Sequence, residues 1–128
     1  MKVYTMPESY EQEMVFAWAE LMATIEPRLE LLHHIPNGGY RHPATAARMK
    51  SEGVKAGVPD ICLPVAAKGY HGLYIEMKKA DGSNRPSNQQ RRWIRLLTKE
   101  GYKAEVAYGA DEAIDILRDY LQLNQEAN

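Results

Sequence analysis

The chain has 128 residues, of which 45% are hydrophobic and 26% are charged, and its formal net charge is −1. These values are ordinary for a soluble globular protein and predict one domain, residues 1–128, with a single modest core. The sequence contains no signal peptide and no apolar run of transmembrane length, so we expect a cytoplasmic protein. Its one cysteine, Cys62, excludes an internal disulfide.

Charge is distributed unevenly along the chain. Residues 41–103 contain thirteen basic and five acidic side chains, whereas residues 1–40 and 104–128 are acidic. A phosphate backbone responds to local positive charge and not to the net charge of the whole molecule. The basic middle segment is therefore consistent with a nucleic-acid partner, and the alternative is a set of solvated helix faces.

The first predicted element is a helix that begins after Thr5. Thr5 as the N-cap, Pro7 in the first turn and Glu8 as the third residue form a predicted capping box. Apolar residues recur at helical spacing and predict the buried face, and Pro27 ends the helix. The residues of that face are Met14, Val15, Trp18, Met22 and Ile25.

The next segments predict a strand, a loop and a second helix. The leucine-rich stretch Leu29–Ile35 is predicted to be the first strand, and residues 37–39 form a glycine-containing loop. His33 and His34 are interpreted as structural histidines, because partners at zinc-ligand spacing are missing from the sequence. The alanine-rich segment Pro43–Lys50 is predicted to be a helix with exposed basic side chains.

A predicted hairpin carries the strongest chemical signal. Ile61–Val65 is a short apolar run typical of a buried strand, and Leu73–Ile75 is a second strand after a turn-rich stretch. Antiparallel pairing would place Asp60, at the start of the first strand, beside Glu76, near the end of the second. Lys78 projects from the same face as Glu76, because side chains alternate along a strand.

This arrangement predicts a metal site with a cation beside it. Asp60 and Glu76 supply the hard oxygen ligands that Mg²⁺ or Mn²⁺ prefers, and such ions support phosphodiester hydrolysis. The ammonium group of Lys78 can position the attacking water and offset the charge that develops at phosphorus.

The rest of the chain is predicted to add two helices and one strand. Ser87 caps a helix that runs to about Glu100, Tyr102–Tyr108 alternates as a strand, and Asp111 caps a final helix ending near Leu123. The order α-β-α-β-β-α-β-α predicts an α/β fold with a mixed central sheet of about four strands and helices on both faces. The residues expected to be buried in the first of these helices are Trp93, Leu96 and Leu97.

Five segments of the sequence carry a family resemblance. They are Ile35–Gly39 together with Arg41, Gly53–Asp60, Gly69–Lys78, Ser87–Gln90, and Gly101 with Tyr102. Together they resemble the VRR-NUC branch of the PD-(D/E)XK nuclease superfamily, and the resemblance covers about residues 8–121. It implies a restriction-endonuclease-like fold and a divalent-metal-dependent DNA endonuclease.

The resemblance also implies roles for residues around the hairpin. The backbone carbonyl of Met77 is expected to be a further metal ligand, and Gln90 is expected to position a water or a phosphate. Ser87 and Gln90 also fit a capping box, which is an alternative reason for that glutamine. A third carboxylate is expected from the first helix, and Glu11 is favoured over Glu8 because it continues the core-facing stripe.

The expected substrate is DNA that is recognised by its shape, because nothing in the sequence reads bases. Stand-alone members of the family imply Holliday-junction resolvase-like activity, and cutting two symmetric strands predicts a homodimer. The alternatives are a duplex-nicking or flap nuclease and a non-catalytic DNA-binding module. The candidate DNA contacts are Arg41, Arg48, Lys50 and Lys55, with Arg91, Arg92 and Arg95 as a second set.

Overall fold

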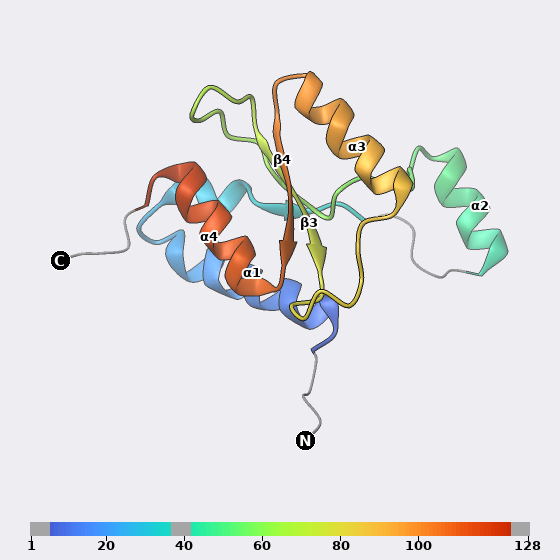
Figure 1. Ribbon diagram of the computed structural model, residues 1–128, viewed down its shortest axis with the longest axis horizontal. Helices are drawn as coiled ribbons and strands as arrows, with labels where there is room; N and C mark the ends of the chain where they lie inside the picture. The colour runs from blue at the N-terminus through green and yellow to red at the C-terminus, as the bar shows by residue number, and fades with distance from the viewer. Residues whose placement is uncertain (1–5, 37–41, 124–128) are drawn as a thin grey trace.

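Figure 1 shows the computed structural model of the chain, which describes residues 6–36 and 42–123. The predicted order α-β-α-β-β-α-β-α is confirmed, and a short 3₁₀ helix, η1, follows the first helix. Within the described ranges, no helix is long and apolar enough to cross a membrane. The elements in these ranges are α1 (Glu8–Met22), η1 (Pro27–Leu31), β1 (His33–His34), α2 (Pro43–Ser51), β2 (Ile61–Leu63), β3 (Leu73–Lys78), α3 (Asn88–Lys99), β4 (Lys103–Tyr108) and α4 (Ala110–Leu121).

The described strands form one four-stranded mixed sheet in the order β1-β2-β3-β4. β2 is antiparallel to both β1 and β3, whereas β3 and β4 are parallel. Ile61 lies opposite Ile75, which confirms the predicted hairpin. Parallel neighbours require a crossover connection, and α3 provides it between β3 and β4.

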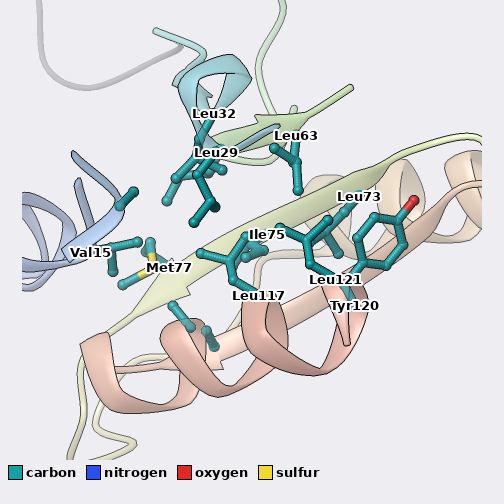
Figure 2. Packing of buried hydrophobic residues seen from close by; sticks show 14 of the residues in the cluster. Val15, Leu29, Leu32, Leu63, Leu73, Ile75, Met77, Leu117, Tyr120 and Leu121 are labelled. Atoms are coloured by element: carbon teal, nitrogen blue, oxygen red, sulfur yellow. The ribbon is translucent and has the colours of Figure 1, made fainter. Parts of the chain in front are cut away.

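The main core lies on one face of the sheet, between β3 and the helices α1 and α4 (Figure 2). Ile75 and Met77 of β3 are buried on this face, as is Val15 of α1. Successive side chains of a strand point to opposite faces, so Glu76 and Lys78 project from the other face. α3 packs against β4 and lies on the other side of the sheet from α1 and α4 (Figure 1).

The start and the buried face of α1 differ from the prediction. The helix begins at Glu8 after Pro7, which provides no side-chain cap, so the capping-box role of Glu8 is wrong; Thr5 lies outside the described residues. Met14 is 45% exposed because it lies off the fully buried row of α1, whose members are spaced by four residues, and Ile25, which follows the end of the helix, is 76% exposed. The residues of that row are Glu11, Val15 and Ala19.

The prediction of a strand over Leu29–Ile35 was wrong for most of its length. The chain forms η1 first, and only the two residues of β1 pair with β2. Pro27 opens the 3₁₀ turn, and the side chain of Glu26 accepts a hydrogen bond from the backbone N–H of Arg28 at 3.2 Å. The local cap and the proline therefore outweigh the leucine-rich composition.

The hairpin strands differ from the prediction only at their ends. β2 ends at Leu63 instead of Val65, because Pro64 has no N–H to donate to the sheet. β3 runs as far as Lys78, so the Glu76–Lys78 segment is part of a regular strand. The last strand, Lys103–Tyr108, confirms the prediction within one residue.

Helix α3 begins as predicted but is more exposed than predicted. Ser87 and Gln90 form the complete capping box. Trp93 and Leu97 are only half-buried and Leu96 is 41% exposed, so the prediction that all three are buried was wrong. The physical reason is that α3 covers the edge of the sheet at β4 and has no second helix packed on it in the described part of the chain.

Helix α4 starts differently from the prediction. Its N-cap residue is Gly109, with φ of 95°, and Asp111 lies within the first turn, so the predicted Asp111 cap was wrong. The first backbone N–H, that of Ala110, instead donates to the Oε1 atom of Glu11 at 2.9 Å. A residue distant in sequence therefore caps this helix, and local sequence signals could not show it.

Candidate active site

The register of the hairpin brings Asp60 and Glu76 together. Ile61 pairs with Ile75, so the preceding residue of β2 and the following residue of β3 are the next opposed positions. The Oδ2 atom of Asp60 accepts a hydrogen bond from the backbone N–H of Met77 at 2.8 Å. This bond holds the Asp60 carboxylate against β3, beside Glu76.

Glu76 is a buried carboxylate with an unmet hydrogen-bonding capacity. Its side chain is 2% exposed, and its Oε2 atom lies 3.4 Å from the Nζ atom of Lys78. Its Oε1 atom is buried and has no hydrogen-bond partner among the described residues. Most buried polar atoms are satisfied, so an orphan carboxylate oxygen suggests a partner that the chain does not supply.

The electrostatics of the pair favour a bound cation. Burial first, and then repulsion by Asp60, raises the pKa of Glu76 to about 8, although the charge of Lys78 opposes this rise. Burial also raises the pKa of Asp60, against the hydrogen bond from Met77. Two carboxyl groups with raised pKa values would both be ionised at neutral pH if a cation bound between them.

The donor set fits Mg²⁺ or Mn²⁺ held partly by other ligands. Within the described residues, no three His, Cys, Asp or Glu side chains gather closely enough to hold a metal on their own. The three-carboxylate site expected from Asp60, Glu76 and Glu11 is therefore not assembled. Mg²⁺ is commonly bound through one or two carboxylates, with waters and substrate phosphates as its other ligands, and the Asp60–Glu76 pair meets that need.

The two helix carboxylates have exchanged the positions that the sequence suggested. Glu11 is 7% exposed and its Oε1 atom accepts the Ala110 N–H, so its negative charge lies at the N-terminus of α4. Glu8 accepts a hydrogen bond from the side-chain amide of Asn84, and its charge acts to raise the pKa of both Asp60 and Glu76. Glu8 is thus the helix carboxylate that faces the pair.

Lys78 lies on the same strand face as Glu76 and is 7% exposed. Its ammonium group is held by the ion pair with Glu76 in a site that excludes most water. A buried ion pair is a weak source of stability, because desolvation offsets much of the attraction. The main effect of the ion pair is therefore to hold the ammonium group of Lys78 beside the two carboxylates.

Gln90 has a structural role that limits what else it can do. Its Oε1 atom accepts the Ser87 N–H at 2.8 Å, and the Ser87 hydroxyl accepts the Gln90 N–H at 3.1 Å. The capping box therefore uses the side-chain oxygen and leaves the amide nitrogen for a water or a phosphate. A catalytic role for Gln90 stays a prediction.

Two residues lie near the Asp60–Glu76 pair although the sequence did not predict this position for them. His34, interpreted as structural, lies at the site: its Nδ1 atom is 2.9 Å from the backbone oxygen of Asp60, and its charge acts to lower the pKa of that carboxyl. Asn84 accepts the Lys79 N–H at 2.9 Å and holds Glu8 through its amide group. Only the pairing of β1 with β2 would have indicated His34, and no local signal indicates Asn84.

The basic residues lie on exposed surfaces at α2 and α3. Arg48, Lys50 and Lys55 are exposed on α2 and on the segment that follows it, and Arg41 lies outside the described residues. On α3 the exposed basic residues are Arg91, Arg92 and Arg95. Contact between either set and DNA stays a prediction.

Two of the comparisons with known proteins find similarity to this chain, one with a family model and one with solved structures. A family model described as the VRR-NUC domain matches residues 4–111. A solved structure named "VRR_NUC domain protein" is 33% identical in sequence and superposes with a TM-score of 0.75. The aligned region covers 95% of this chain and 93% of the chain in that structure. No curated protein matches the chain.

Proposed function

The chain belongs to the VRR-NUC domain family of the PD-(D/E)XK superfamily, and from this premise we propose that it is a divalent-metal-dependent DNA endonuclease. Membership of the family by itself implies a nuclease-type domain that processes DNA. The observation that best supports metal dependence is the buried, unpartnered Oε1 atom of Glu76, next to Asp60 and Lys78.

In this proposal the residues of the hairpin divide the work. Asp60, Glu76 and the backbone carbonyl of Met77 would hold Mg²⁺ or Mn²⁺, which supplies an activated water and stabilises the leaving oxygen. Lys78 holds the attacking water or a phosphate oxygen through its ammonium group, which the ion pair with Glu76 keeps in place. Glu8 takes the helix position first assigned to Glu11, because its charge reaches both carboxylates.

Exchanging each helix carboxylate for its amide separates the two roles. Glu8→Gln is expected to lower the cleavage rate by about tenfold or more, since groups that orient metal ligands have effects of that size. Glu11→Gln is expected to leave cleavage nearly unchanged and to lower the melting temperature by a few degrees, because about 1 kcal/mol of charge–helix interaction at α4 is lost. Cleavage rates and thermal melts of the two matched variants test this, and the reverse ranking would return the role to Glu11.

The proposed substrate is branched DNA, and the proposed active form is a homodimer. Nothing in the sequence reads bases, which favours recognition of DNA by its shape. An exposed apolar row on α1 offers a candidate surface between two copies, because residues at this helical spacing share one face of the helix. Its residues are Tyr10, Met14 and Leu21, with exposed fractions of 53%, 45% and 72%.

A cleavage panel tests the substrate and the metal together. Labelled four-way junction, flap, duplex and single-stranded DNA of shared sequence are incubated with Mg²⁺, Mn²⁺ or EDTA, and the mass of the protein in solution is measured. We expect paired, symmetric cuts in the junction, only with metal, by a species of dimer mass. Preferred cutting of flap or duplex would replace the junction assignment, and binding without cleavage in every metal would identify a binding module.

A further inference from the structure

Helix α2 receives almost no support from the rest of the protein. It has nine residues, none of which is buried. It stands to one side of the molecule in Figure 1 and packs extensively against no other helix or strand in the described part of the chain. Isolated helices shorter than about 12–15 residues are marginal in water, so α2 is expected to be only partly formed in the free protein.

The ends of α2 are nevertheless shaped for a helix. The Nδ1 atom of His42 accepts the Ala44 N–H at 3.1 Å, and Pro43 occupies the first turn. At the other end Gly53, with φ of 103°, reverses the chain so that the Val54 N–H donates to the carbonyl of Met49 at 2.9 Å. Both caps are local, so the sequence favours the helix but supplies no tertiary packing to complete it.

The charge of this segment indicates what could stabilise it. In the segment 42–55, which we call the basic arm, Arg48, Lys50 and Lys55 are exposed and Glu52 is the one acidic residue. An unpacked helix with this charge complements a polyanion and repels a basic partner.

The basic arm is also connected directly to the candidate active site. The segment after it packs closely on α3: a Cβ atom added at Gly57 would lie 2.7 Å from Gln89 and 2.8 Å from Trp93. Asp60 follows three residues later, directly before β2. The chain that follows the arm is therefore held on α3, three residues before Asp60, whereas the helix itself extends to one side of the molecule.

We propose that the basic arm is a DNA-binding element whose helix becomes stable only on the DNA backbone, so that helix formation in residues 43–51 is coupled to binding. The identity of the partner rests on the proposed nuclease function. The coupling rests on the exposure, length and charge of α2, and it does not involve the Asp60–Glu76 pair.

Hydrogen exchange in EDTA tests the coupling without any cleavage. In the free protein, the hydrogen-bonded amides of α2 are expected to exchange far faster than those of α4, which packs in the core. Addition of a short DNA duplex is expected to slow exchange in α2 by at least about tenfold and to leave α4 unchanged. Full protection in the free protein would overturn the proposal. So would protection that grows with protein concentration without DNA, because it would assign the surface to a second copy.

Alanine-to-glycine variants locate the cost of forming the helix. Ala46→Gly and Ala47→Gly remove exposed methyl groups and no described contact, and each disfavours a helix by about fivefold. If the helix forms on binding, the double variant weakens DNA binding by roughly 25-fold at unchanged melting temperature. The matched control is Ala17→Gly, an exposed alanine of α1 that lies in the helical row between Met14 and Leu21. It is expected to lower the melting temperature and, at protein concentrations where its mass in solution equals that of the wild type, to leave affinity unchanged.

The charge of the arm gives a second, independent readout. Arg48→Ala with Lys50→Ala is expected to reduce the slope of log affinity against log salt by about two, with equal losses for unrelated sequences. Unchanged affinity in both double variants would overturn the proposal. If the protein cuts DNA but shows none of these effects, the nuclease function stands and the proposal for the basic arm fails. If it shows these effects but cuts no DNA, the proposal for the arm stands and the nuclease function fails.

Discussion

Glu76→Gln is expected to lower the rate of DNA cleavage by about 10²- to 10³-fold or more, the range seen when one charge-stabilising group is removed from an active site. The substitution keeps the shape of a buried side chain and removes the negative charge that faces Asp60 and Lys78. Asp60→Ala is expected to have an effect of the same order, because it removes the other carboxylate of the pair.

The fold and the DNA-binding surface should survive these substitutions. DNA affinity in EDTA is expected to stay within a few-fold of wild type, since the exposed basic residues lie outside the pair. The matched control is Glu105→Gln on the adjacent strand β4, where the carboxylate is 37% exposed and paired with Lys103. Wild-type cleavage by Glu76→Gln, or equal loss in Glu105→Gln, would contradict the assignment of the site.

The stability of the metal-free protein is expected to fall as the pH rises from about 5 to 8. Burial and the neighbouring Asp60 raise the pKa of Glu76 in the folded state to about 8, from its ordinary value of 4.5. Below pH 4.5 the group is protonated in both states; between the two pKa values only the folded protein keeps the proton. Unfolding then releases a proton, so each increase in pH in this window favours the unfolded state.

The size of this effect makes it measurable by chemical denaturation. A pKa difference of this size between the folded and unfolded protein lowers the free energy of unfolding by about 3–5 kcal/mol across the window from pH 5 to 8. The raised pKa of Asp60 adds a loss of the same sign at the acidic end. Glu76→Gln cannot ionise, so it is expected to remove most of the pH dependence and to be more stable than wild type at pH 8 in EDTA.

Metal provides the complementary measurement. Added Mg²⁺ is expected to restore the stability of the wild type at pH 8, because a ligand that binds only the folded state stabilises it, and to have little effect on Glu76→Gln. Stability that is flat or rises between pH 5 and 8 in EDTA would show that Glu76 is not held in the buried, desolvated state described above. In that case Glu76→Gln would lose activity without gaining stability, and the site would show no trade-off between the two.

The sequence by itself determined the elements whose signals are local. The apolar runs on both sides of a turn predict the β2–β3 hairpin, and strand pairing then places Asp60 beside Glu76 without further information. The Ser87–Gln90 capping box is complete within four residues and starts α3 where predicted. Alternation along a strand likewise put Lys78 on the Glu76 face, where the ion pair is found.

Only the tertiary structure decided how the helices are rotated and what caps them. Residues three positions apart on a helix point about 60° from each other, so the packing of α1 on the sheet separates the buried Glu11 from the exposed Met14. That same packing directs Glu8 toward the pair and leaves Glu11 to cap α4, across 99 residues of sequence. Such contacts depend on the global arrangement of chain segments that local patterns do not encode, and for this reason the hairpin was predictable and the helix carboxylate was not.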